Sequence, residues 1–358
     1  MFGNVPVTFV DEHKHLGLTL SSDGKWNNHI NNIMTSASKI LGVMRKVEYK
    51  LSRKCLNQIY FTHLRPLLEY ACVVWDGCTL YDKELLEKIQ NEAARIVSGL
   101  TRSVSLRNLY TEVKWPSLEK RRSYLKLINI YKMHNGQCPN YLNNLLPPTV
   151  HEQSSLNLRN AEDYTILSRR TLLYSRSFLP SAINLWNSLP IEIRNIDTIS
   201  KFKTSLKQLF NLCEDNPPYF YIGDRHSSIL HARLRNNCSN LNSDLFINHL
   251  KNTPLCACGN DAENAEHYFF YCHTYHLQRI ALFTALRSFH PLNCEVFLYG
   301  KPSLNNENNT IIFNEVKKHI FYDKAIHCLA TFFHFAGQDL LLSLLLYVLL
   351  SLLISFFV

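Results

Sequence analysis

The stretch INNIMTSASKILGVMRKV, residues 30–47, decides the fold class expected of this chain. Its apolar side chains recur at spacings of three and four residues, which places them on one face of an α-helix. They are Ile30, Ile33, Ala37, Ile40, Met44 and Val47. This period predicts an amphipathic helix that packs its apolar face against other helices.

Further apolar stripes of the same period follow along the chain. One begins at Leu56 and is interrupted by Pro66, as a kink or as the first turn of a new helix. Two others run over residues 85–96 and 118–131. Several such helices in succession predict an α-helical bundle.

A different pattern precedes the helices. Residues 5–26 alternate apolar and polar side chains on either side of a polar break, which predicts two short strands and a turn at Ser22-Asp23-Gly24. The expected fold class is therefore mainly α, after a short β segment.

The positive charge of the chain is concentrated in the helical segment. The net charge is +9, and residues 39–132 alone hold 18 Lys+Arg against 9 Asp+Glu. A local surplus of this kind is typical of a protein that binds a polyanion, although a bundle with solvated lysine faces gives the same count. The basic residues between the apolar stripes include Arg45, Lys46, Lys50, Arg53, Lys54, Arg121 and Arg122.

Four of the eleven cysteine and sixteen histidine side chains gather in CACGNDAENAEHYFFYC, residues 256–272. Cys256, Cys258, His267 and Cys272 supply three thiolates and one imidazole, the closed four-coordinate set of a structural zinc site. His276 is a spare that could replace His267. The alternatives are chance spacing and a histidine that is merely packed among aromatic rings. The polar loop inside the cluster has no core of its own, which favours the metal.

The other cysteines follow no disulfide-like framework, and the chain starts without a signal peptide, so a reducing, intracellular setting fits best. Residues 340–358 carry no charge, proline or glycine and are long enough to span a bilayer as a helix. Lysines precede this tail and none follows it, which predicts a tail-anchored protein with its N-terminal bulk in the cytosol. A buried C-terminal helix or a spurious extension of the reading frame would explain the same tail.

Several phrases of the chain are similar, in the same order, to the segment after the catalytic palm of reverse transcriptases from non-LTR (LINE-type) retrotransposons. These phrases are HLGLTLSSDGKWNNHI, HLRPLLEYACVVWDG, SLEKRRSYLKLINIYK, LWNSLPIEIRNIDTISKFKTSL and RHSSILHARLRNNCSNLNSDLF, followed by the Cys-His cluster. The resemblance covers roughly residues 10–325. It implies a palm-end remnant around Leu16 and Gly17, then a helical thumb that grips a template–primer duplex.

The resemblance also implies roles for particular residues. Lys39, Arg45, Lys46, Arg53 and Lys54 fall in the thumb-like region, as candidate phosphate contacts, and Cys256, Cys258, His267 and Cys272 match the family's Cys-His motif. Arg121 and Arg122 join the candidate nucleic-acid contacts as basic residues of the same bundle.

The domain organisation expected from these patterns has five parts. They are a palm-end remnant (1–26), a basic thumb-like domain (27–136), a linker and connector (137–222), a helical region with a zinc-knuckle-like module (223–328) and a candidate transmembrane helix (340–358).

One departure from the family decides the expected activity. The family's polymerases carry paired aspartates that hold two divalent ions for phosphoryl transfer. This sequence contains no adjacent aspartate pair, and only Asp11 and Asp23 lie in the palm-like remnant. We therefore expect a reverse transcriptase (RNA-directed DNA polymerase) fragment that binds an RNA or DNA template–primer duplex without polymerising, and that takes no small-molecule substrate.

Two other interpretations stay open at this point. The chain is a tail-anchored membrane protein whose helical body is an interaction scaffold, with the retroelement resemblance as ancestry only. Alternatively it works in trans with a separate chain that carries the palm.

Overall fold

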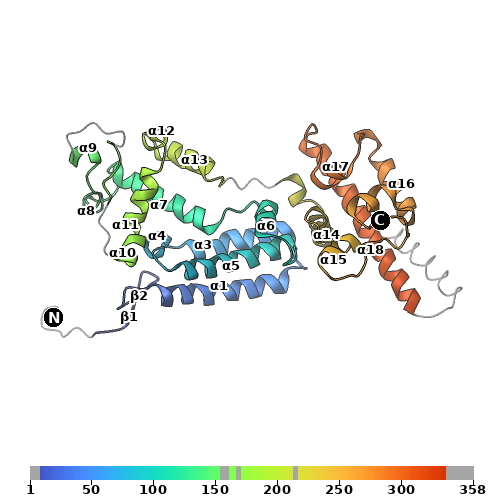
Figure 1. The fold of residues 1–358 in the computed structure, drawn as a ribbon, viewed down its shortest axis with the longest axis horizontal. Helices are drawn as coiled ribbons and strands as arrows, with labels where there is room; N and C mark the ends of the chain where they lie inside the picture. The colour runs from blue at the N-terminus through green and yellow to red at the C-terminus, as the bar shows by residue number, and fades with distance from the viewer. Residues whose placement is uncertain (1–8, 154–160, 167–170, 213–216, 336–358) are drawn as a thin grey trace. The chain divides into compact units, whose positions relative to one another are not determined.

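The computed structural model describes residues 9–153, 161–166, 171–212 and 217–335. Over these residues the chain is mainly helical, with one two-stranded antiparallel sheet, which confirms the mainly α fold class. The chain divides into two compact units, residues 1–217 and 218–358 (Figure 1). This boundary lies close to the expected one at residues 222 and 223.

The first unit begins with strands β1 (Glu12–His15) and β2 (Leu18–Ser21). Its longer helices are α1 (Asn27–Val47), α5 (Leu80–Ser98), α6 (Leu106–Val113), α7 (Leu118–His134), α11 (Phe178–Asn187) and α13 (Ile199–Leu209). Its shorter ones are α2 (Arg53–Ile59), the π-helix η1 (Tyr60–Leu64), α3 (Arg65–Glu69), α4 (Cys72–Trp75), α8 (Asn140–Asn143), α9 (Val150–Gln153), α10 (Leu172–Arg176) and α12 (Ile191–Arg194).

The β-hairpin turns at Leu16-Gly17, not at Ser22-Asp23-Gly24 as the sequence pattern predicted. Both turn residues have positive φ, +46° and +82°, as in the tight turns that suit the twist of a hairpin. The Tyr70 hydroxyl donates to the Leu16 carbonyl over 2.8 Å, and a side chain at residue 17 would meet the Tyr70 ring. The turn is therefore held against the end of α3, a contact that local sequence does not reveal.

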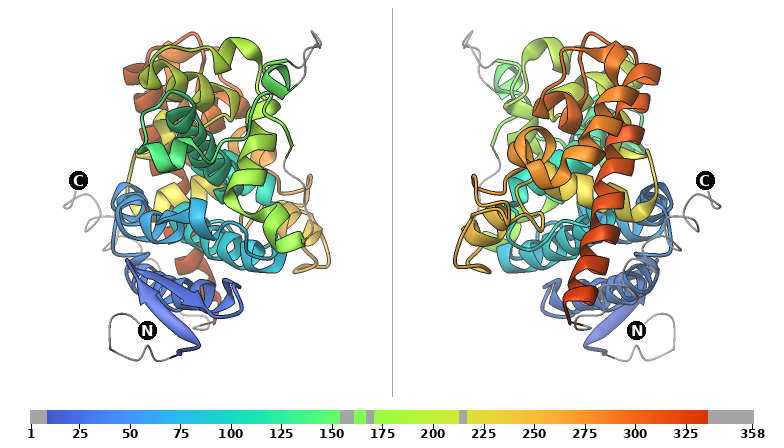
Figure 2. Two further views of the ribbon diagram at one scale, coloured as in Figure 1. Left: turned by 90° about the vertical axis from the view of Figure 1, so that its left-hand side faces the viewer. Right: turned by 90° about the vertical axis from the view of Figure 1, so that its right-hand side faces the viewer.

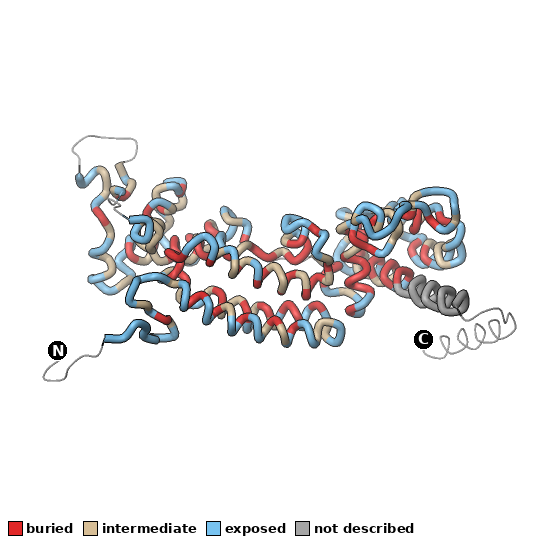
Figure 3. Tube along the Cα trace, turned by 60° about the horizontal axis from the view of Figure 1, so that its bottom comes forward, coloured by how far each residue is buried: buried red, intermediate tan, exposed pale blue. Residues whose placement is uncertain are grey.

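Helices α1 and α5 form the centre of the first unit's N-terminal half, side by side (Figure 1). Thr79 and Asp82 form a capping box that starts α5, and Gly99 ends it in the left-handed region. Buried positions recur along α1 with the helical period (Figure 3). The buried residues of α1 are His29, Ile30, Ile33, Ala37, Leu41 and Met44.

Helix α7 is buried on more than one side, which corrects the expected domain organisation. It packs against α4 and α5 of the thumb-like region and also against α11 and α13 of the expected connector. Tyr131 of α7 stacks on Phe202 of α13, with ring centroids 4.2 Å apart, and Trp186 of α11 joins the same core. The expected boundary at residue 136 thus does not separate two compact units, because α7 packs against helices on both sides of it and the first unit runs to residue 217.

The second unit starts at Pro218. Its elements are η2 (Pro218–Phe220), α14 (Arg225–Arg235), α15 (Asn242–Ile247), the π-helix η3 (His267–Tyr271), η4 (His273–Tyr275), α16 (His276–Ala285), η5 (Arg287–Phe289), α17 (Cys294–Tyr299) and α18 (Asn306–Phe335).

Helix α18 organises the core of the second unit. It packs against α14, α16 and α17 and is one continuous helix in the right-hand view of Figure 2. Ile312 and Val316 of α18 are fully buried, together with Phe269 and Phe297. This core lies directly behind the segment that carries the cysteine–histidine cluster, since Phe269 belongs to η3.

The membrane expectation falls outside what the structure describes. Among the helices of the described residues, none combines the length and the apolar character that crossing a bilayer requires. The expected span, residues 340–358, lies outside the described residues.

Candidate metal centre and basic helical surface

The first two cluster cysteines lie on a tight turn. The turn is closed by a bridge between Leu255 and Ala262, with the Cys256 N–H donating to the Asp261 carbonyl over 2.9 Å. Gly259 reverses the chain with φ of +79° and has open space where a Cβ would lie. The backbone is thus bent so that the Sγ atoms of Cys256 and Cys258 lie within 4.8 Å of each other.

The other two members lie at the two ends of one π-helix, η3. His267 begins η3, and the Cys272 N–H donates to the His267 carbonyl over 2.8 Å, five residues back. This wider helical turn brings residues at i and i+5 to the same side, where an α-helix would separate them. The five-residue spacing of His267 and Cys272 is unusual for two metal ligands on an α-helix, but it suits the π-helix that the chain forms.

The four predicted ligand atoms come together in the structure. The Sγ atoms of Cys256 and Cys272 are 3.6 Å apart, and Cys258 Sγ lies 3.2 Å from His267 Nε2. All four atoms lie within 4.8 Å of one another. Tetrahedral sulfur ligands about 2.3 Å from a metal are about 3.7 Å apart, so the set is compatible with a metal such as zinc. The spare, His276, is exposed at the start of α16 and lies outside this group.

Burial and hydrogen bonding give the thiols different acidities. Burial raises the pKa of Cys256 to about 12, because a thiolate is poorly solvated there. The pKa of Cys258 is lowered, first by the Asn260 N–H, which points to its sulfur. The buried Nδ1 of His267 has no hydrogen-bond partner among the described residues, so Nε2 is the nitrogen turned to the cluster.

Two residues that sequence reasoning missed support the cluster. Arg279 of α16 donates to the carbonyls of Phe270 and Cys272, and these hydrogen bonds fix the backbone of the ligand Cys272. Glu263 is buried, with one carboxylate oxygen 3.9 Å from Cys256 Sγ and the other accepting the Asn242 N–H over 2.9 Å. No signal in the sequence marks Glu263 or Arg279, because neither is part of the Cys-His ligand pattern.

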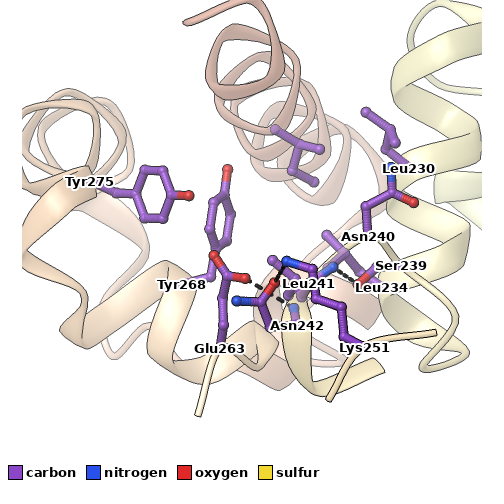
Figure 4. A pocket seen from close by; sticks show the side chains of 11 residues that line it. Leu230, Leu234, Ser239, Asn240, Leu241, Asn242, Lys251, Glu263, Tyr268 and Tyr275 are labelled. Atoms are coloured by element: carbon purple, nitrogen blue, oxygen red, sulfur yellow. Dashed lines mark hydrogen bonds between the residues drawn. The ribbon is translucent and has the colours of Figure 1, made fainter. Parts of the chain in front are cut away.

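Glu263 also lines a pocket of 160 Å³ beside the cluster (Figure 4). The rings of Tyr268 and Tyr275 meet edge to face at one side of it, 4.9 Å apart. Asn242 and Lys251 are joined across the other side by a hydrogen bond of 2.5 Å. Its remaining lining comes from leucines of α14, Ile320 of α18 and the segment of residues 239–241 between α14 and α15.

Three of the predicted nucleic-acid contacts are exposed lysines. Lys39 and Lys46 lie on the solvent face of α1, and Lys54 lies at the start of α2. None of the three has an acidic group within ion-pair distance among the described residues. Arg45 is also exposed, but it is paired with Glu92 at 3.1 Å.

The other three predicted contacts are structural charges instead. Arg53 is buried and forms an ion pair with Glu112 at 2.8 Å. Arg122 is buried beside Asp76, also at 2.8 Å, and Arg121 forms a two-pronged pair with Glu69. Arg53 and Arg122 are removed from solvent and so do not face a ligand on the outer surface, and Arg121 is largely occupied.

Comparison with protein-family models, with curated proteins and with solved structures found no match to this chain.

Proposed function

We propose that this chain is a reverse transcriptase fragment that holds the phosphate backbone of an RNA or DNA template–primer duplex through the basic face of α1. Binding without polymerisation is proposed, because the sequence holds no adjacent aspartates to position two divalent ions. The observation that carries this function is the pair of exposed, unpaired lysines on one stripe of α1, Lys39 and Lys46.

The geometry of this stripe suits a phosphate backbone. Lys39 and Lys46 are two helical turns apart, about 10 Å along the axis. That spacing is close to three rises of about 3.4 Å each along the axis of a duplex. Their contacts would neutralise phosphates without reading base sequence, so affinity rather than specificity depends on them.

We further propose that zinc is the metal of the cysteine–histidine cluster. Three sulfur ligands and one imidazole select zinc over the hard cations that prefer oxygen. A closed four-coordinate set leaves no position for a reacting water, so the metal is structural. It would fix the loop of residues 256–272, whose polar centre contributes little to the core.

The test is a duplex-binding titration at two salt concentrations. The logarithm of affinity should fall linearly with the logarithm of salt, by about one unit of slope for each phosphate contact. A Lys39→Gln/Lys46→Gln double variant should lose about two units of that slope.

The matched control is Lys201→Gln/Lys207→Gln, which removes the same charge from exposed lysines of α13, outside the basic segment. It should retain the wild-type slope. Equal losses in both double variants would show that net charge alone sets the affinity, and the assignment to α1 would be withdrawn.

A further inference from the structure

A second group of basic side chains lies inside the first unit, at the junction of α4, α5, α7 and α11. Its centre is Asp76, directly after α4. Lys83 Nζ and Lys126 Nζ lie 3.1 and 2.5 Å from the Asp76 carboxylate, and Arg122 Nε lies 2.8 Å from it. Three cations therefore surround one buried carboxylate.

These groups line a pocket of 330 Å³. The pocket also presents the hydroxyls of Ser123 and Ser181, and Ser181 Oγ accepts from Lys126 over 2.9 Å. A water in the liquid takes about 30 Å³, so the space accommodates a tetrahedral oxyanion together with a substituent or several waters.

The charge of the lining is not balanced. The second carboxylate of the lining, Glu119, is exposed at its edge. The nearby Glu87 does not line the pocket, and its two oxygens accept the Glu119 N–H and the Tyr110 hydroxyl. Buried cations without a full set of counter-charges are costly unless an anion joins them.

Arg122 gives the second, independent indication. Its side chain is 3% exposed and its Nε faces the Asp76 carboxylate at 2.8 Å, yet its Nη1 makes no hydrogen bond to any residue that the structure describes. Buried guanidinium groups are normally satisfied, because an unpaired buried donor carries the full cost of its lost hydration. A planar guanidinium fork matches two oxygens of a phosphate group.

We propose that the Asp76 pocket, defined by Asp76, Lys83, Arg122, Lys126, Ser123 and Ser181, binds a phosphate group. Asp76 holds the three cations in place, and their surplus charge attracts the anion. The site does not depend on the α1 surface, because none of its residues belongs to α1. A free phosphate and a phosphate of a nucleic-acid strand offer the same oxygens, so either could supply the anion.

The first experiment titrates the full chain with inorganic phosphate by calorimetry, at constant ionic strength in chloride. The test variant is Lys83→Gln, which removes the most accessible of the three cations, with its side chain 25% exposed. The matched control is Lys88→Gln, an exposed lysine on the same helix that does not line the pocket. We expect phosphate to bind the wild type and the control equally and Lys83→Gln about ten-fold more weakly, the size of one charge-assisted hydrogen bond.

A second variant separates loss of the site from loss of the fold. Ser123→Asp adds a carboxylate inside the pocket and should abolish phosphate binding, while the melting temperature in chloride stays equal or rises. Absence of phosphate binding in the wild type, or equal binding in all variants, would overturn the site and leave a hydrated ion-pair network.

The source of the phosphate is read from competition. Displacement of bound phosphate from the wild type by a short duplex would assign the pocket to a nucleic-acid strand. Phosphate that stays bound in the presence of saturating duplex would assign it to a small phosphate-bearing molecule. If the salt titration showed that α1 does not bind a duplex, the phosphate-binding result for this pocket would still stand, since inorganic phosphate is the probe here.

Discussion

Arg53 and Glu112 form an ion pair at 2.8 Å inside the first unit, with side chains only 2% and 4% exposed. The pair joins the start of α2 to the end of α6 across 59 positions of sequence. Lys54, the next residue, is exposed and has no acidic partner among the described residues. Two adjacent basic residues therefore have opposite roles, one in folding and one at the surface.

Replacing Arg53 by alanine should destabilise the first unit by about 3–5 kcal/mol, because it leaves the Glu112 carboxylate buried without its counter-ion. Lys54→Ala should change the free energy of unfolding by no more than about 0.5 kcal/mol. Urea unfolding followed by tryptophan fluorescence measures both, since all four tryptophans lie in this unit. If Arg53→Ala kept its stability and lost duplex affinity instead, Arg53 would be a nucleic-acid contact and its pair with Glu112 would not stabilise the fold.

The fold was predictable from the sequence for helices that bury one face and expose the other to water. The spacing of Ile30, Ile33 and Ala37 located α1 because its other side meets water. Helix α7 was misread, because Arg122 was taken for part of a solvent face. In the structure α11 covers that side, and Asp76, directly after α4, forms ion pairs with both Arg122 and Lys126.

The candidate site shows the same limit. The four metal-ligating residues were found because they lie within seventeen positions and their chemistry is specific. Glu263 and Arg279 support the cluster through backbone groups, and no residue type or spacing announces that role. Likewise, the sequence predicts the same surface role for Arg53 and Lys54. Only the structure shows that Arg53 is buried beside Glu112 while Lys54 is exposed.

Cys258→Ser should release the metal, since it removes a ligand that is half-exposed and can be replaced without disturbing the core. The loss of affinity should exceed the about 10- to 100-fold cost of losing an outer partner. Zinc content after dialysis measures it, and proteolysis between residues 250 and 280 should increase. Cys55→Ser, at an exposed cysteine outside the cluster, is the control. Stoichiometric zinc retained by Cys258→Ser would show that these four residues are not the ligand set.

Metal affinity should rise with pH. Without metal, burial keeps the pKa of Cys256 at about 12, so this thiol is protonated at neutral pH and must release its proton to bind. Each released proton makes the apparent affinity about ten-fold higher per pH unit. The lowered pKa of Cys258 makes that thiol contribute less to the slope. Competition with a chelator at about pH 6.5 and about pH 7.5 measures the slope, and an affinity independent of pH would mean that the thiols are already ionised.

His319 should make the second unit sensitive to acid. Its ring is buried and packs against the rings of Tyr268 and Phe269, with centroids 5.5 and 5.9 Å away. Burial, reinforced by the charge of Arg279, lowers its pKa to about 4, against about 6.5 in an unfolded chain. Between these two values the unfolded state binds more protons than the folded state. The stabilisation is therefore complete above about pH 6.5 and is lost as the pH falls through about 4, by about 3 kcal/mol in total.

Hydrogen exchange of residues 306–320 measures this loss, because tryptophan fluorescence reports only the first unit. His319→Leu fills a similar volume without a titratable group, so its protection against exchange should fall less between about pH 6.5 and about pH 4 than that of the wild type. His276→Leu, at an exposed histidine of α16, should follow the wild type. Protonation of the cysteine thiols also weakens metal binding in acid, and it does so equally in all three chains. A pH dependence that is the same in His319→Leu and wild type would therefore assign the acid sensitivity to the metal cluster and not to the buried histidine.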